Sequence, residues 1–343
     1  MVSQETMRER FRSQLLSGER ARTPLAVAEQ LLAIQAQDLR GFRLAVRARS
    51  TAERVSVLDA ALAARELVVG WLNRGTLHLV PSADYRWLHS LVSPQLERPL
   101  ARRREQLGIS PSVAERALTE ITKTLANGPT TRSQLVAVFE KRGLPSVGQA
   151  PVHLFGLAAQ RGLILRGPMQ GREQAYVMTD DWLGPRDPGV DREVALAELA
   201  RRYLVGHGPA DVRDLSQWSG LSLTECRKGF ASIASELVER SDGLFSLHGQ
   251  DEKNACMPPS LLLGAFEPLL LGWSSRDEIV GENWERVARG GMISAFALVE
   301  GRAAANWRVE GRRVEITPFS PLGDETQQVL DTEADAVLRY LDL

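Results

Sequence analysis

The sequence is poor in the residues on which many enzyme sites depend. It has two cysteines, Cys226 and Cys256, and its five histidines are scattered over 343 residues, at positions 78, 89, 153, 207 and 248. A disulfide framework or a zinc site needs more thiols or closely spaced histidines, so neither is predicted. Lysine is rare as well, and occurs only at Lys123, Lys141, Lys228 and Lys253. The positive charge is therefore carried mainly by arginine, whose planar guanidinium binds phosphates well.

Long apolar runs and a strong net charge are also missing. No run of about 18 apolar residues occurs and the first ten residues are polar and charged, so neither export nor membrane anchoring is predicted and a cytoplasmic protein is expected. The formal net charge is −1 and the pI is about 6.6. A uniformly basic protein is thereby excluded. Any surface that binds nucleic acid must be a local concentration of arginines.

Common catalytic motifs are absent. The sequence contains no nucleophile elbow, no Walker loop, no His-Glu-x-x-His and no dinucleotide fingerprint. An enzyme with this sequence needs a reaction that depends on positioning and electrostatics. No metal and no cofactor are predicted.

The N-terminal third predicts helices that lead into one polar triplet. Met7, Phe11 and Leu15 recur at helical spacing, and Thr23 with Pro24 predicts the capped start of a second helix that runs to about residue 34. The next residues are Gln35-Ala36-Gln37. In an extended segment the two glutamines share one side while the alanine turns back into the fold.

The spacing of the apolar residues changes within residues 56–81, from that of helices to that of a strand. Two helices are predicted, at 56–65 and 66–73, and then a strand in which Leu77 and Leu79 share one face while Thr76 and His78 share the other. Helices followed by a short strand are typical of a winged helix-turn-helix. Residues 1–105 are predicted to form the first such domain.

One pattern occurs twice in the middle of the chain. The Gly-Pro units that begin at Gly128 and Gly208 align at a constant offset, and each is followed by a predicted third helix and two short strands. We therefore predict two further winged-helix domains, at 106–190 and 191–255, with a linker at 187–189.

The C-terminal residues 256–343 change character. Val-Glu-Gly-Arg occurs at 299–302 and again at 309–312, and each copy joins two strand-like runs. A meander of strands 292–300, 302–309 and 312–318 is predicted, followed by a helix from about Glu333. Arg302, Arg312 and Arg313 are expected to cluster near the tips of the meander.

Several stretches, taken in order, resemble the AlkZ/YcaQ family of bacterial DNA glycosylases. They are the Gln-Ala-Gln triplet after an amphipathic helix, residues 71–80, the two Gly-Pro units, and residues 262–270. The resemblance covers nearly the whole chain. It implies an α+β fold of tandem winged helix-turn-helix units, three in number, in a C-shaped arrangement, with a C-terminal antiparallel β meander.

The resemblance also implies an activity. The family removes alkylated purines such as N7-alkylguanines, and some members unhook interstrand crosslinks. Its catalytic motif is Gln-Φ-Gln in the AlkZ branch and Gln-Tyr-Asp in the YcaQ branch. Gln35 and Gln37 match the first form, with the small Ala36 at the Φ position, so both glutamines are implied to be catalytic. Asp38 is interpreted as a solvated or capping residue, and no role is assigned to Glu267 or Asp277.

The chemistry of such a reaction suits two amides. N7-alkylation makes guanine a cationic leaving group, so a positioned water and oriented carbonyl dipoles are sufficient, and no lysine nucleophile or lyase activity is needed. Double-stranded DNA is the expected partner, bound by a monomer associated with the nucleoid. The predicted DNA-binding residues are Arg40, Arg43, Arg47, Arg74, Thr76, His78, Arg302, Arg312 and Arg313.

Alternatives remain open at this point. His78 also fits a core histidine with a satisfied hydrogen bond. An edge that contacts phosphates is suggested by four arginines that alternate with apolar residues, Arg40, Arg43, Arg47 and Arg49. Each of these arginines also fits a solvated surface charge. A winged-helix transcriptional regulator without catalysis, and a scaffold for protein contacts, are the rival functions. The two glutamines discriminate between them, because a regulator has no need for two amides on one side.

Overall fold

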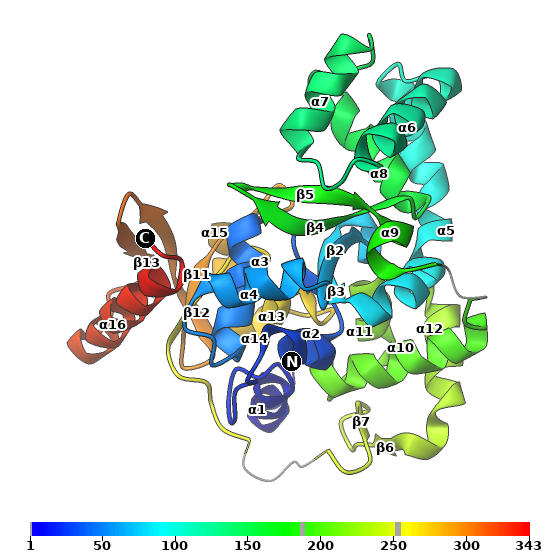
Figure 1. The fold of residues 1–343 in the computed structure, drawn as a ribbon. Coiled ribbons are helices and arrows are strands. Elements are labelled where there is room, and N and C mark those ends of the chain that lie inside the picture. Colours follow the sequence, from blue (N-terminus) through cyan, green and yellow to red (C-terminus); the bar gives the residue numbers. More distant parts are fainter. Residues whose placement is uncertain (1, 186–188, 251–254) are drawn as a thin grey trace. The chain divides into compact units, whose positions relative to one another are not determined.

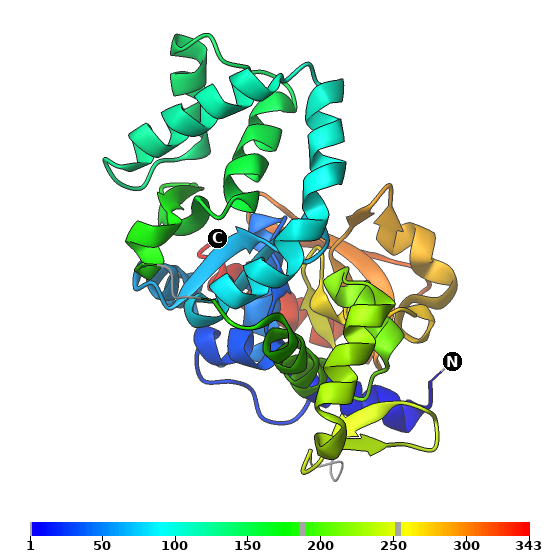
Figure 2. The ribbon, with the colours of Figure 1, turned by 90° about the vertical axis from the view of Figure 1, so that its right-hand side faces the viewer.

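The structure, a computed structural model, describes residues 2–185, 189–250 and 255–343, without the side chains of residues 97–99. The chain divides into two compact units (Figure 1, Figure 2). The first unit combines Met1–Leu58 with Leu196–Leu343, and the second is Asp59–Ala195. Helices and antiparallel sheets occur in both, which confirms the predicted α+β class. Asp187 and Pro188 of the predicted linker lie outside the described residues.

The first unit begins with three helices, α1 (Gln4–Ser13), α2 (Pro24–Leu31) and α3 (Leu39–Arg49). Thr23 caps α2 through Ala26 N and Pro24 is its first residue, as predicted. The helix ends at Leu31 rather than near residue 34, because Leu32 adopts a φ of 62° that an α-helix cannot contain. α1 ends at Ser13 and buries Met7 and Phe11.

Two segments have the same order of helices and strands. Each has three helices followed by an antiparallel hairpin. In each, the residue before the N-cap of the middle helix forms an isolated β-bridge with a strand of the hairpin. These bridges are Thr130 with Tyr176 and Ala210 with Phe245. This internal repeat agrees with the predicted elements. The first copy consists of α6 (Pro111–Leu125), α7 (Arg132–Lys141), α8 (Ala150–Gln160), β4 (Ile164–Gln170) and β5 (Glu173–Met178). The second copy consists of α10 (Arg192–His207), α11 (Val212–Ser219), α12 (Leu223–Ser232), β6 (Leu237–Glu239) and β7 (Phe245–Leu247).

Polar caps explain where these helices begin. Thr131 and Asp211 each form a capping box with the residue three positions later, which satisfies two backbone donors at the helix start. The second copy lies beside α1 (Figure 2). Ion pairs join them, from Arg240 to Glu9 at 2.7 Å and from Arg10 to Asp214 at 3.3 Å.

The second unit contains an antiparallel sheet of order β3-β2-β4-β5. Its strand β2 (Leu67–Trp71) corrects the prediction of a helix at 66–73, and it pairs along its whole length with β3 (Leu77–Pro81). Leu67, Val68 and Val69 are fully buried, and such a continuous apolar run with β-branched residues favours a strand covered on both faces. The unit also contains the end of α4 (Val55–Ala63), η1 (Asn73–Gly75), α5 (Ser82–Gln106) and α9 (Thr179–Leu183).

The C-terminal part of the first unit contains a four-stranded sheet of order β13-β12-β11-β8. Helix α16 (Asp324–Tyr340) packs against it through Leu330, Val337 and Tyr340 (Figure 1). The strands are β8 (Leu261–Leu263), β11 (Phe296–Val299), β12 (Arg302–Glu310) and β13 (Arg313–Pro318).

This region corrects three predictions. β8 was not predicted. The expected strand 292–300 is divided, because β10 (Met292–Ile293) pairs with β9 (Ala288–Arg289) and only β11 joins the sheet. α16 begins at Asp324 rather than near Glu333. The remaining short elements are η2 (Ala234–Glu236), α13 (Pro268–Leu271), α14 (Asp277–Val280), η3 (Gly281–Asn283) and α15 (Trp284–Val287).

Candidate active site

The two glutamines lie in a short extended segment between α2 and α3. β1 (Ile34–Gln35) is extended, and the N-cap of α3 follows at Asp38. Ala36 is 4% exposed and Gln35 is 7% exposed, whereas Gln37 is exposed. The chain therefore anchors the first glutamine in the protein and presents the second to solvent.

The two amide side chains meet. Gln35 Nε2 donates a hydrogen bond of 2.6 Å to Gln37 Oε1, so both side chains lie on one side of the segment and Ala36 lies on the other. This is the geometry that an alternating, extended segment predicts. Gln37 Nε2 has no partner among the described residues, 2–185, 189–250 and 255–343. One exposed amide group thus remains able to donate to a ligand.

Asp38 caps the helix that follows. Its Oδ1 accepts a hydrogen bond of 2.5 Å from Gly41 N, which satisfies a backbone donor in the first turn of α3. The capping interpretation of Asp38 is thereby confirmed. Because Gln37 directly precedes this cap, the position of α3 sets the position of Gln37.

Three of the predicted DNA-binding arginines lie on α3. Arg40, Arg43 and Arg47 are three and four residues apart, so they share one side of the helix. Arg40 is exposed and Arg43 is half-buried. Arg47 forms two hydrogen bonds with Glu333, of 2.8 and 3.0 Å, and this carboxylate neutralises its charge. Arg40 is therefore the residue of the three most open to a phosphate.

Arg49 is not part of an exposed basic edge, and this corrects the sequence-based expectation. Its side chain is fully buried and forms an ion pair with Glu267, which is also fully buried. On a helix, Arg47 and Arg49 point in different directions. The fully desolvated pair explains the position of Glu267, for which the sequence suggested no role.

Arg74, Thr76 and His78 belong to the other unit. Arg74 is half-buried and has a left-handed backbone with φ 55°, and Thr76 Oγ1 donates to Asn73 O at 3.0 Å. His78 is 2% exposed and its Nδ1–H donates to Thr76 O at 3.0 Å. Burial, reinforced by the charge of Arg74, lowers the pKa of His78 to about 3. His78 thus matches the core-histidine alternative, and its low exposure argues against contact with a phosphate.

The three C-terminal arginines do not form one cluster. All are exposed, but Arg302 begins β12 whereas Arg312 and Arg313 follow its far end. Successive turns of a meander lie at opposite ends of the shared strand, and at roughly 3.3 Å per residue the nine residues of β12 separate them by roughly 30 Å. This corrects the expected clustering and leaves separate basic positions.

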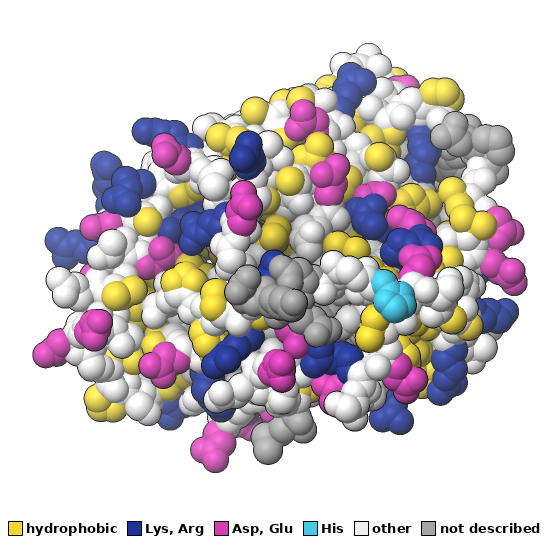
Figure 3. Space-filling model, turned by 90° about the horizontal axis from the view of Figure 1, so that it is seen from below, with side chains coloured by type: hydrophobic (Ala, Val, Ile, Leu, Met, Phe, Trp, Pro, Cys, Tyr) yellow, Lys and Arg dark blue, Asp and Glu magenta, His cyan; other side chains and the backbone are white. Residues whose placement is uncertain are grey.

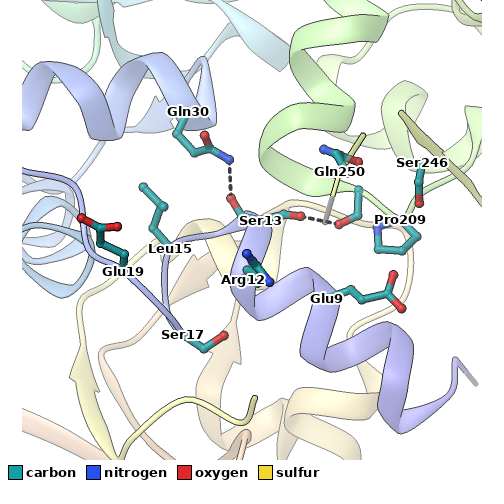
Figure 4. A pocket seen from close by; sticks show the side chains of 11 residues that line it. Glu9, Arg12, Ser13, Leu15, Ser17, Glu19, Gln30, Pro209, Ser246 and Gln250 are labelled. Atoms are coloured by element: carbon teal, nitrogen blue, oxygen red, sulfur yellow. Dashed lines mark hydrogen bonds between the residues drawn. The ribbon is translucent and has the colours of Figure 1, made fainter. Parts of the chain in front are cut away.

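A polar pocket that the sequence did not indicate lies elsewhere in the first unit (Figure 4). Its volume is about 290 Å³ and α1 supplies much of its wall, including Glu9, Arg12 and Ser13. Ser13 Oγ donates to Gly208 O at 2.7 Å. Because that proton goes to a carbonyl group and not to a base, the serine is not an activated nucleophile. Gln35 and Gln37 are not among the described residues that line this pocket.

In the described ranges no three His, Cys, Asp or Glu side chains lie close enough to hold a metal ion. No helix in the part of the chain that the structure describes is long and apolar enough to cross a membrane. On the face in Figure 3, acidic and basic side chains are interspersed among the described residues, as the net charge of −1 leads one to expect.

The fold and the amide pair together define an α+β protein with two carboxamides at the start of an arginine-bearing helix. Its fold is similar to that of the solved Streptomyces sahachiroi DNA glycosylase AlkZ, with a TM-score of 0.80 and 22% identity over 98% of this chain and 95% of that chain. The family described as DNA glycosylase AlkZ-like matches residues 28–340, a span that includes both glutamines. The chain therefore belongs to the AlkZ-like DNA glycosylase family, which confirms the resemblance.

One curated relative extends the comparison. The chain is 26% identical over 339 residues to an "Interstrand DNA cross-link repair glycosylase" from Streptomyces sahachiroi. The match covers 91% of this chain and 89% of the relative.

Proposed function

We propose that the protein is a monofunctional DNA glycosylase that hydrolyses the N-glycosidic bond of N7-alkylated guanine in double-stranded DNA. Bulky adducts and interstrand crosslinks are included among its substrates. It acts as a monomer, without a metal or a cofactor, and Gln35 and Gln37 are its catalytic residues. The observation that carries the proposal is the 2.6 Å hydrogen bond that presents the exposed amide of Gln37 in a fixed orientation.

On the basis of this hydrogen bond, we assign different tasks to the two amides. Gln37 Oε1 has two lone pairs and accepts from Gln35 Nε2 with one of them. The other lone pair accepts a hydrogen bond from a water and turns the lone pair of that water toward C1′ of the damaged nucleotide. As the C1′–O bond forms, the C1′–N9 bond breaks, the base leaves in its neutral form, and the proton lost by the water passes to solvent. Gln37 Nε2 donates to the deoxyribose or to a phosphate. Gln35, which is almost buried, holds Gln37 in place.

Two neutral amides are sufficient because of the state of the substrate. A guanine alkylated at N7 is cationic and leaves without a strong acid, so what remains is to place water and to stabilise the developing oxocarbenium ion. Oriented carbonyl dipoles supply that stabilisation without reorganising, and holding water next to C1′ converts a bimolecular step into an intramolecular one.

Lyase activity is not expected. A β-lyase step needs an amine nucleophile, whereas release of a cationic base by a positioned water needs none. The expected product is an intact abasic site. Alkali is then required to cleave the strand.

Two features are proposed to bind DNA, namely exposed arginines and the segments that consist of helices and a hairpin. The two segments with three helices and a hairpin, together with the N-terminal segment, are proposed to be tandem winged helices in the C-shaped arrangement of the family. Exposed Arg40, Arg302, Arg312 and Arg313 are proposed to contact phosphates, with Arg43, Arg47, Arg74 and Thr76 in supporting positions.

An exposed catalytic amide favours large adducts. A closed pocket requires the base to be flipped out of the duplex, which a crosslinked base cannot do. Gln37 is exposed and reaches a lesion that stays in the duplex. The name of the curated relative, a cross-link repair glycosylase, supports this substrate class. The biological role proposed is base excision repair or self-resistance to a genotoxin.

The test is release of a damaged base. Duplex DNA with N7-methylguanine, or with a nitrogen-mustard crosslink, is incubated with the protein, and the free base and the alkali-labile sites are measured with and without EDTA. Release of the base, unaffected by EDTA and without strand cleavage before alkali, is expected. Binding to DNA with no release from any cationic purine adduct would instead favour the winged-helix regulator.

A further inference from the structure

Residues 262–270 carry part of the family resemblance, yet they take no part in the proposed chemistry or in the proposed DNA contacts. In the structure this segment lies against α3. A Cβ atom on Gly41 would collide with the carbonyl oxygen of Ala265, and a Cβ on Gly264 would lie 2.8 Å from Gly41 O and 2.9 Å from Gly41 Cα. Two glycines thus let the first turn of α3 meet the turn after β8 backbone to backbone.

The C-terminal end of α3 is fixed by the same segment. The guanidinium of Arg49 donates to Glu267 Oε1, and both side chains are fully buried. Glu267 Oε1 also accepts from Leu269 N at 3.2 Å, and Arg49 donates to Gln14 Oε1 at 3.0 Å. A buried charge that loses its partner is strongly unfavourable, so this pair holds α3 in one position along its axis.

A third attachment lies between these two. Arg47 of α3 forms two hydrogen bonds with Glu333 of α16, and Glu333 Oε1 accepts from Leu262 N of β8 at 3.3 Å. α3 is therefore attached to the C-terminal part of the first unit at its first turn, through Gly41, and in its last turn, through Arg47 and Arg49.

We propose that these contacts form an α3 clamp, made by Gly41, Arg47, Arg49, Gly264, Glu267 and Glu333, that positions the catalytic amides. Glu267 is a positioning residue in it. The proposal rests on the proposed function, because it assumes that the orientation of Gln37 limits excision. Gln37 is joined to α3 through the cap at Asp38. A shift of α3 therefore displaces Gln37 relative to Gln35, and misplacing a reacting group by roughly 1 Å can slow a reaction about 100-fold.

The first test compares two glycines in helices. Gly41→Ala introduces a collision with the carbonyl oxygen of Ala265 that only a shift of α3 or of the turn after β8 relieves. A Cβ on Gly156, in α8, instead meets no atom within 4 Å outside the backbone of its own helix. We expect Gly41→Ala to lower the single-turnover excision rate about 10- to 100-fold while the Kd for DNA changes less than about threefold. Gly156→Ala should match the wild type in both.

A second readout does not depend on activity. The side-chain amide resonances of Gln35 and Gln37, assigned in ¹⁵N spectra with Gln35→Ala and Gln37→Ala, report the hydrogen bond between them. Gly41→Ala and Glu267→Gln should shift these resonances, and Gly156→Ala should not. If the wild type releases no base, the proposed function fails, but the resonances still decide whether the clamp positions the amides.

A milder variant is available if Gly41→Ala and Glu267→Gln do not fold. Glu333 is 14% exposed and its partner Arg47 is 11% exposed, so Glu333→Gln leaves a charge that water can reach. Its excision rate should fall several-fold, while its DNA affinity should not fall, because Arg47 loses a neutralising carboxylate. Folded Glu267→Gln, Gly41→Ala or Glu333→Gln protein with wild-type amide resonances and a wild-type excision rate would overturn the proposal.

Discussion

Replacing Glu267 by alanine should strongly destabilise the first unit. The change leaves the guanidinium of Arg49 without its carboxylate in a place where both side chains have no exposed surface. It also removes the acceptor of the hydrogen bond from Leu269 N. No solvent reaches Arg49 to replace what is lost.

The magnitude follows from these two losses. Breaking a buried ion pair from one side costs about 3–5 kcal/mol, and an unsatisfied backbone donor adds about 1 kcal/mol or more. The sum, about 4–6 kcal/mol, is a large part of the 5–15 kcal/mol that typically separates folded from unfolded protein. Glu315→Ala is the matched control, because Glu315 pairs with Arg308 at 2.6 Å but the two side chains are 49% and 68% exposed. No measurable loss of stability is expected from it.

Urea denaturation at pH 7 measures both variants. Glu267→Ala should lower the free energy of unfolding by several kcal/mol, and the double variant Arg49→Met with Glu267→Met should recover much of it, because apolar residues of similar size often replace a buried ion pair without loss. The reasoning is refuted if Glu267→Ala is within about 1 kcal/mol of the wild type, or if Glu315→Ala costs as much.

Three further predictions concern other groups. Burial lowers the pKa of His207 from 6.5 to about 3, so between those pH values the unfolded chain binds more protons than the folded chain. This histidine should therefore contribute about 2 kcal/mol to the loss of unfolding free energy when the pH falls from 7 to 5. His207→Phe should remove that contribution, and an unchanged loss would contradict the assignment. Cys256 is exposed, whereas Cys226 is buried and desolvation raises the pKa of its thiol to about 11. A thiol reagent at pH 8 should therefore label only Cys256 in the folded protein, and should label Cys226 as well once urea is added. Arg40→Ala should weaken binding to undamaged DNA and reduce the slope of log K against log salt by about 1, and an unchanged slope would remove Arg40 from the interface.

Local signals in the sequence predicted much of the fold. Helix starts were predictable because a capping side chain and its helix are neighbours in sequence. The signals were Thr23 before Pro24 and the Gly-Pro units before Thr131 and Asp211. The relation of Gln35 to Gln37 was predictable for the same reason, since alternation in an extended segment depends on two residues alone. The 2.6 Å hydrogen bond between them agrees with it.

The errors arose where distant contacts decide the structure. β2 was taken for a helix, and only its pairing with β3 and β4 distinguishes a buried apolar strand from a helix segment. β8 is a run of three leucines without alternation, and it is a strand because β11 lies beside it. The alternation of Arg47 and Arg49 with apolar residues could not reveal that one meets Glu333 and the other meets Glu267. Those partners lie more than two hundred residues away in the sequence.

The central claim is that two neutral amides, with Gln35 holding Gln37, carry out base excision. The most direct measurement is the single-turnover rate of N7-methylguanine release by the wild type and by Gln35→Ala/Gln37→Ala, with the Kd of each for the same duplex. Removing one preorganised transition-state donor typically lowers a rate about 10²- to 10³-fold, so the double variant should be slower by about 10³-fold while its Kd stays within a few-fold of the wild type. Equal rates for the two proteins would contradict the account.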